Sequence, residues 1–178
     1  MERAFRYAQE ADPTTLAFYN DYNVLFKNKQ DKIVSMIQGI QSKGIKIDGM
    51  GIQAHVRTGQ SNATRQDMAA AIKRFGDLGL QVHITELDVK ASDDSQEEMQ
   101  KQAQIYQDFL AACVFDNPGV CTAFLSWGFT DKYTWLGSNY YPLPFDQNYQ
   151  KKLAYTAMLD LLNGKTDSQG DQTAFLQN

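Results

Sequence analysis

The chain has 178 residues, enough for one well-packed domain, and its 43% hydrophobic and 21% charged residues are typical of a globular protein, not a disordered one. Its formal net charge of −4 at pH 7, with no basic stripe, argues against nucleic-acid binding. No apolar run is long enough to span a membrane, and the first ten residues lack the pattern of a signal peptide.

The first half of the chain alternates between helical and strand patterns. Three segments have the apolar spacing of amphipathic helices, and three short apolar runs between them predict strands. In chain order these are a helix at 2–11, a strand at 16–19, a helix at 30–43, a strand at 49–55, a helix at 64–78 and a strand at 80–85. Thr64 is expected to cap the third helix, because a threonine hydroxyl accepts hydrogen bonds from N–H groups of a first turn.

The second half continues the alternation. It predicts a long helix at 95–115, a strand at 121–127 and a last helix at 149–163, with a loop rich in aromatic residues before that last helix. Four strands that each precede a helix indicate a parallel sheet flanked by helices. Two architectures fit this order: a small open doubly wound domain, or part of a (β/α)8 barrel, which needs roughly 250 residues when complete.

Polar and aromatic residues lie at the C-terminal end of each predicted strand. In parallel α/β folds these ends meet at one edge of the sheet, where reactive groups gather. Amides and carboxylates hydrogen-bond hydroxyl groups, and indole faces stack on the apolar faces of pyranose rings, so the set suits a sugar site. Its members, in chain order, are Asn20, Tyr22, Gln53, His55, Glu86, Asp88, Trp127 and Trp135.

Five segments carry a family resemblance. They are FYNDYN at 18–23, GMGIQAH at 49–55, HITELDV at 83–89, WGFTDKYTW at 127–135 and PLPFDQNYQKKLAY at 142–155. In this order and near this spacing they resemble segments of family 10 glycoside hydrolases, chiefly endo-β-1,4-xylanases. The resemblance implies that residues 1–164 are the C-terminal half, strands 5–8, of a (β/α)8 TIM barrel, followed by a polar tail at 165–178.

The resemblance implies catalytic roles for three residues. Glu86 matches the family's nucleophile, a carboxylate that forms a covalent glycosyl intermediate later displaced by water. His55 matches the histidine that hydrogen-bonds this nucleophile, and Asp88 matches the carboxylate on the other side of that histidine. His83 lies inside the third predicted strand and is interpreted as structural.

The resemblance also implies a substrate. Asn20, Tyr22 and Gln53 match positions that line the family's sugar subsites, and Trp127 and Trp135 match the indoles that form the wall around the cleaved sugar. The expected ligand is therefore xylan or a xylo-oligosaccharide. No metal-ligand constellation and no glycine-rich phosphate loop occurs in the sequence, so we expect no cofactor.

One departure from the family limits how far the activity can be carried over. The family's general acid/base is a glutamate at the end of the fourth barrel strand, which precedes the helix with which this chain begins. We therefore expect the chain to be inactive alone and to need either an N-terminal half barrel or a second copy of itself. The alternative is a non-catalytic module that binds xylan or serves in assembly.

The two cysteines, Cys113 and Cys121, flank a turn-like segment between the long helix and the last predicted strand. Their placement would allow a disulfide, which implies an oxidising compartment, but two buried free thiols fit the spacing equally well. The family resemblance implies an extracellular or periplasmic location.

Overall fold

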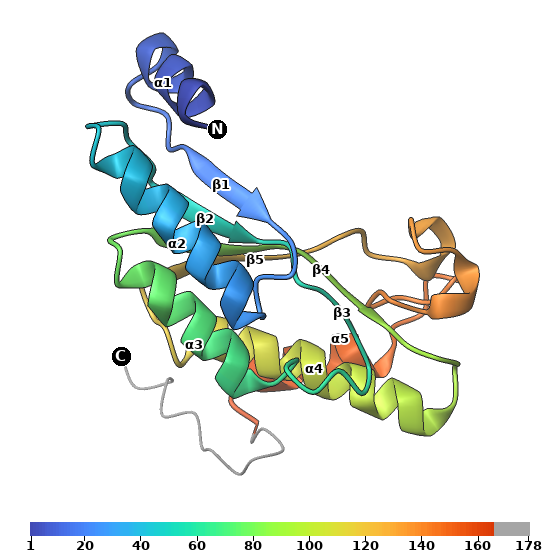
Figure 1. Cartoon of the computed structure of the whole chain (residues 1–178). Coiled ribbons are helices and arrows are strands. Elements are labelled where there is room, and N and C mark those ends of the chain that lie inside the picture. The colour runs from blue at the N-terminus through green and yellow to red at the C-terminus, as the bar shows by residue number, and fades with distance from the viewer. Residues whose placement is uncertain (166–178) are drawn as a thin grey trace.

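The computed structural model describes residues 1–165, which form a parallel sheet with helices along one side (Figure 1). The helices are α1 (Glu2–Ala11), α2 (Lys27–Gln41), α3 (Arg65–Gly76), α4 (Gln96–Val114) and α5 (Leu153–Leu162). The strands are β1 (Phe18–Asp21), β2 (Gly49–Ile52), β3 (His55–Arg57), β4 (Gln81–Lys90) and β5 (Cys121–Ser126), and two 3₁₀ helices, η1 (Asp131–Tyr133) and η2 (Ser138–Tyr140), follow β5. The predicted α/β alternation is confirmed.

The sheet has β4 at its centre. Strands β2 and β3 both pair with one edge of β4, along its first and second halves respectively, and β5 pairs with the other edge. Strand β1 pairs with β2, and every one of these pairings is parallel. Among the described residues, β1 and β5 are therefore the two edges of a sheet built from four βα units.

The prediction of a single strand at 49–55 is wrong. The structure has two strands there, β2 and β3, because the chain leaves the sheet at Gln53 and Ala54. Ala54 has a φ of 62°, in the left-handed region that residues with a Cβ rarely adopt. The backbone N–H of Gln53 donates to the carbonyl of Asp21 instead of continuing the β4 ladder. The break lets His55 resume pairing directly opposite Asp88.

The strand predicted at 80–85 is shorter than the one observed. Strand β4 runs from Gln81 to Lys90, because its second half gains a partner in β3. Glu86 and Asp88 therefore lie within the strand rather than in a loop after it. Asp88 is paired directly opposite His55, whereas Glu86 lies where the pairing of β4 with β5 is irregular, between Ile84 and Leu87.

Helix boundaries follow the sequence signals to within two residues except at two starts: α2 begins at Lys27, three residues before the predicted start, and the last helix begins late. The side chain of Thr64 accepts a hydrogen bond from the N–H of Asp67, as predicted for an N-cap. The last helix begins at Leu153, not at 149, because Tyr149 has a φ of 62° and belongs to a turn around Asp146. The predicted tail at 165–178 lies outside the described residues except for Lys165, whose Nζ is 2.6 Å from a carboxylate oxygen of Asp160.

The hydrophobic core lies between the sheet and the helices on one of its faces. In β4, Val82 and Ile84 are fully buried on the helix side, while His83 and Thr85, which alternate with them, are only half-buried. Figure 1 shows α2 to α5 on one side of the strands, and no helix of the described chain on the other. One face of the sheet is therefore packed, and the face that carries His83 and Thr85 is open.

Helix α1 stands apart from the other helices, beyond β1 (Figure 1). It is tied to the rest of the chain by an ion pair between Glu2 and Lys43, 2.5 Å long, and by a hydrogen bond from the N–H of Lys46 to the side chain of Gln9. An apolar hollow of about 360 Å³ lies between α1 and β1. This side of the molecule is thus incompletely packed.

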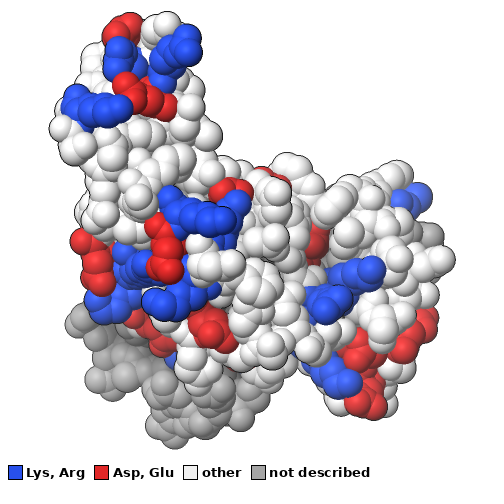
Figure 2. Space-filling model, viewed as in Figure 1, with Lys and Arg blue, Asp and Glu red and all other residues white. Residues whose placement is uncertain are grey.

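The surface carries both signs of charge. On the face shown in Figure 2, Lys and Arg side chains alternate with Asp and Glu over α2 and α3, without a patch of one sign. An example is the pair of Arg74 with Asp31, which joins these two helices. Within residues 1–165 no helix is both long and apolar enough to cross a membrane.

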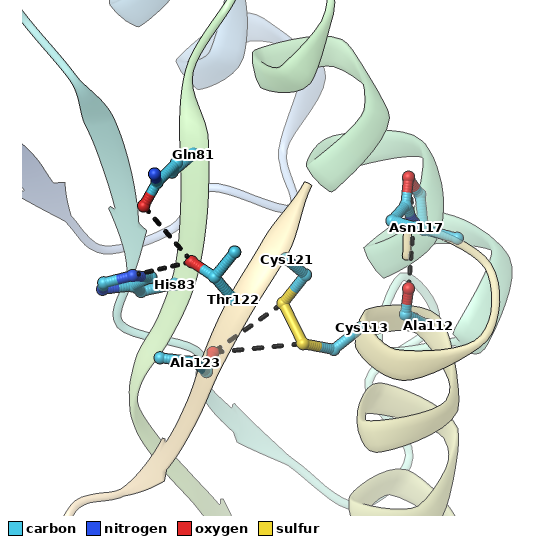
Figure 3. Close-up of a disulfide and its surroundings, with 9 residues drawn as sticks. Gln81, His83, Ala112, Cys113, Asn117, Cys121, Thr122 and Ala123 are labelled. Atoms are coloured by element: carbon cyan, nitrogen blue, oxygen red, sulfur yellow. Dashed lines mark hydrogen bonds between the residues drawn. A yellow bond between two sulfur atoms is a disulfide. The ribbon is translucent and has the colours of Figure 1, made fainter. Parts of the chain in front are cut away.

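A disulfide joins the C-terminal end of α4 to the start of β5. Cys113 and Cys121 are bonded, with their Cα atoms 5.1 Å apart, so of the two possibilities left open by the sequence the structure has the bonded one. Figure 3 shows the carbonyl of Ala123 beside both sulfur atoms; these contacts are not S–H hydrogen bonds, because a disulfide has no thiol proton. The side-chain amide of Asn117 donates a hydrogen bond to the carbonyl of Ala112 near the end of α4.

Removing this disulfide should destabilise the fold without changing it. The bond spans eight positions of sequence, and closing a loop of that length stabilises a protein by about 2.5 kcal/mol in the chain-entropy treatment. We expect the variant with Cys113→Ala and Cys121→Ala to lose about that much unfolding free energy in urea denaturation. A reductant should destabilise the wild type and leave the double variant unchanged; equal effects on both would contradict the prediction.

Candidate active site

The carboxylate of Glu86, on the central strand β4, lies at the middle of the site, toward the C-terminal ends of the strands. Its side chain is 13% exposed, and each of its oxygens has a different hydrogen-bond donor. The amide nitrogen of Asn20, from β1, donates to Oε1 over 2.7 Å, and Nε2 of His55, from β3, lies 3.3 Å from Oε2. Three strands therefore converge on one carboxylate.

His55 lies between two carboxylates. Its Nδ1 is 3.0 Å from Oδ2 of Asp88, whose side chain is only 2% exposed, and its Nε2 faces Glu86. An ionised carboxylate can only accept hydrogen bonds, so both contacts are satisfied together only when both ring nitrogens carry a proton. The site thus favours the imidazolium form of His55.

The pKa of His55 is shifted accordingly. The hydrogen bond to Asp88 raises it most, burial opposes the shift, and the negative charges of Asp88 and Glu86 add to the increase. The pKa of His83 is lowered, because that ring is partly buried without an acidic partner. The ring of His83 stacks on Phe18 at 4.2 Å and its Nε2 is 3.0 Å from the hydroxyl of Thr122, which fits a structural part in the sheet.

Two indole rings stand beside His55. The ring of Trp135 is 5.3 Å from the imidazole, the ring of Trp127 is 6.5 Å away, and both meet it edge-on. The Nε1 of Trp135 donates to the same Asp88 oxygen that His55 contacts, over 2.7 Å. The indoles are 48% and 61% exposed, for Trp127 and Trp135 respectively, and so have apolar surface free for a ligand.

The remaining predicted sugar contacts lie on the neighbouring loops. Tyr22 is 55% exposed after β1, and its ring is held by the ammonium group of Lys29, 4.7 Å from the ring centre. Gln53 is half-buried in the break between β2 and β3. The structure brings all eight predicted site residues to the same edge of the sheet, while their roles toward a sugar stay predictions.

The loop that carries the indoles is anchored by a buried ion pair that sequence patterns did not single out. Nζ of Lys152 is 2.9 Å from Oδ2 of Asp131, whose side chain is fully buried. The N–H of Leu143 donates to Oδ1 of Asp131 over 2.7 Å. Burial raises the pKa of Asp131 and lowers that of Lys152, in each case against the pull of the partner's charge.

Thr85 is a second residue that the sequence did not single out. Its hydroxyl donates to Oδ1 of Asn20 over 2.8 Å, on the open face of the sheet. Strand alternation places Thr85 on that face, but only the three-dimensional register brings it to Asn20. As for metals, residues 1–165 contain no group of three or more His, Cys, Asp and Glu that could hold an ion.

Comparison with known proteins gives a consistent match. Residues 1–161 match the model of glycosyl hydrolase family 10. The chain is 37% identical to endo-1,4-beta-xylanase B of Thermotoga neapolitana over 172 residues, 93% of this chain and 49% of the relative. It is 34% identical to an endo-1,4-beta-xylanase of Geobacillus stearothermophilus over 177 residues, 90% of this chain and 53% of the relative.

A solved structure gives the same match in three dimensions. Xylanase 10B from Thermotoga petrophila in complex with xylobiose superposes with a TM-score of 0.82 and 36% identity, over 91% of this chain and 50% of that one. The chain thus spans about half the length of these relatives. This match, with the four parallel βα units, confirms the expected partial (β/α)8 barrel.

The two histidines should titrate in opposite directions. By NMR we expect the imidazole of His55 to titrate above the ordinary value of about 6.5 and that of His83 below it. Asp88→Asn should lower the pKa of His55 and leave His83 unchanged. Because the folded-state pKa is raised, His55 stabilises the fold fully below about pH 6.5, and this contribution is lost as pH rises through the raised pKa. His55 titrating below His83 would contradict this.

Breaking the buried pair should cost far more than breaking an exposed one. Lys152→Met leaves Asp131 buried and unpaired, which typically costs about 3–5 kcal/mol of unfolding free energy. Lys73→Met is the matched control, because the pair of Lys73 on α3 with Asp77, just after the end of that helix, is open to solvent. We expect urea denaturation to show a large loss for the first variant and little for the second. Similar small losses would mean that the loop is not anchored by this pair.

Proposed function

This chain belongs to glycosyl hydrolase family 10, and on that basis we propose that it is the nucleophile-bearing part of a retaining endo-1,4-β-xylanase. The observation that carries the proposal is the Glu86 carboxylate, held by donors on both oxygens at the edge where the strands end. A held, ionised carboxylate is the group required to attack an anomeric carbon. His55 and Asp88 support it, because their hydrogen bonds fix the imidazole against Glu86.

The proposed reaction is a double displacement. An oxygen of Glu86 attacks the anomeric carbon as the leaving oxygen departs, and water then releases the sugar from the covalent intermediate with net retention. The first step needs a general acid about 5 Å from the nucleophile. Glu2, Glu97 and Glu98 are poor candidates, because they lie on α1 and α4 and are engaged in other ion pairs or hydrogen bonds. We propose that the acid comes from another polypeptide segment.

The proposed substrate is xylan or a xylo-oligosaccharide. Two structural relatives support it, because their structures hold such ligands: the xylanase 10B described above with xylobiose, and a mutant xylanase 10C from Cellvibrio japonicus with xylopentaose. In this chain the exposed rings of Tyr22, Trp127 and Trp135 are suited to stack on sugar faces. Gln53 is suited to bond sugar hydroxyls.

The proposed partner is an N-terminal half barrel, with a second copy of the chain as the other possibility. An open sheet leaves unpaired backbone groups along its two edge strands, here β1 and β5. An apolar side chain of one edge strand is also exposed: Leu125 of β5 is 47% exposed. A segment that extends the sheet past β1 and β5 would cover both features.

Without that partner we expect the chain to be inactive. Loss of general acid catalysis alone typically costs about 10² to 10⁴ in rate. The substrate-binding residues that the proposed partner would supply would also be absent from the cleft. As for location, a Cys113–Cys121 disulfide persists in oxidising surroundings, which supports an extracellular or periplasmic site for the protein.

The second candidate function is a non-catalytic module that binds xylan or takes part in assembly. The observation that favours it is the pair of exposed indoles, Trp127 and Trp135, which need no general acid to stack on a sugar. The two functions differ in their dependence on Glu86. Binding by the indoles should survive Glu86→Ala, whereas hydrolysis should not.

Mixing the chain with a separately produced N-terminal half of a related xylanase tests the proposed function. We expect no release of reducing sugar from xylan by either half, and activity only after mixing, because the nucleophile and the acid then share one cleft. Glu86→Ala in this chain should abolish the activity, and Glu97→Ala on α4 is the matched control that should retain it.

If size-exclusion chromatography shows that the two folded halves bind each other and xylan is still not cleaved, the binding or assembly function is favoured. Robust hydrolysis by the chain alone would refute the requirement for a partner.

A further inference from the structure

The side chain of Asn20 crosses one strand to reach another. Asn20 of β1 pairs with Gly51 of β2, and Gly51 in turn pairs with His83 of β4. A Cβ placed on Gly51 would lie 2.5 Å from Oδ1 of Asn20, well inside contact distance. The asparagine therefore occupies space that exists only because Gly51 has no side chain, and this space leads directly to β4.

Two residues of β4 form hydrogen bonds with the two ends of the Asn20 amide. Its Nδ2 donates to Oε1 of Glu86 over 2.7 Å, and its Oδ1 accepts from the hydroxyl of Thr85 over 2.8 Å. The orientation is determined by chemistry, because an ionised carboxylate only accepts and so must face the NH₂ end. The carbonyl end is then free to receive the Thr85 proton. One amide orientation satisfies both neighbours.

We propose that Asn20 is a positioning residue for the nucleophile, an inference that rests on the proposed function of Glu86. The terminal torsion of a glutamate is broad, so a carboxylate with one donor can still rotate. With His55 on Oε2 and Asn20 on Oε1, the carboxylate plane is held at two points. These two hydrogen bonds orient the Glu86 carboxylate toward the anomeric carbon. Each carboxylate oxygen keeps a second lone pair, which is available for the attack.

This role differs from the sugar contact that the sequence implies for Asn20. The amide already donates one N–H to Glu86 and accepts a hydrogen bond from Thr85 with one lone pair of its oxygen. A sugar contact would weaken substrate binding when lost, whereas a positioning contact lowers the rate of attack and leaves binding intact. The two roles are therefore separable by kinetics.

The test uses the 178-residue chain mixed with the N-terminal half of a related xylanase and a 2,4-dinitrophenyl 2-deoxy-2-fluoro-β-xylobioside. Glu86 forms a bond to the anomeric carbon as the bond to dinitrophenolate breaks, and the phenolate leaves with the electron pair and needs no proton. The fluorine slows release of the trapped glycosyl group. Phenolate absorbance gives the rate and dissociation constants, and mass spectrometry locates the label.

We expect Asn20→Ala to lower the labelling rate constant about 10- to 100-fold with the dissociation constant unchanged, the effect of losing one hydrogen bond to a charged group. Asn20→Asp should be slower still, although it is the closer isostere, because it places a second carboxylate against Glu86. Gly51→Ala should resemble Asn20→Ala by displacing the amide. Gly39→Ala on α2, where an added Cβ meets nothing within 4 Å, is the matched control and should label like the wild type.

Three results would overturn the inference: an unchanged rate for Asn20→Ala, a change confined to the dissociation constant, or a milder effect of Asn20→Asp than of Asn20→Ala. Failure of the wild-type pair to label at all would instead count against the proposed function. In that case NMR of the chain alone decides the Asn20 contact. One Asn20 side-chain amide proton should lie downfield and return to an ordinary position in Glu86→Ala; an unchanged signal would refute the contact.

Discussion

The parallel register around β4 is the constraint on which the site depends. Glu86 and Asp88 lie on one strand, but neither is held by its own neighbours in sequence. The groups that hold them come from the strands on one side, Asn20 from β1 and His55 from β3, and from Trp135 beyond β5 on the other. A shift of one residue in any of these pairings would turn the relevant side chain to the opposite face.

Much of the fold could be predicted from the sequence, because the signals that define it are local. Helical spacing, the Thr64 cap and short apolar runs marked the helices and strands to within a few residues. The gathering of polar residues at strand ends also followed from a general rule for parallel sheets. What the sequence could not show was the break at Ala54, since an alanine gives no signal of a left-handed conformation.

The sequence named residues that the structure brings together, while their roles in catalysis and sugar binding stay predictions. His55, Glu86 and Asp88 follow from motif and strand position. The contact of Asn20 with Glu86 depends on two successive strand pairings and on the bare backbone of Gly51, which no local pattern encodes. The buried pair of Asp131 and Lys152 depends on a turn of the loop that brings residues 21 positions apart together. Long-range geometry decides both.

The hydrogen bond from Trp135 to Asp88 gives the protein an optical reporter. The indole N–H and the imidazole of His55 share one carboxylate oxygen, so the electric field at the indole depends on the charge of that imidazole. Indole emission responds to nearby charge, and the chain has two tryptophans. We therefore expect the tryptophan emission of the chain, to which Trp127 beside the same imidazole also contributes, to change with the ionisation of His55 in dilute solution, without isotopes or sugar.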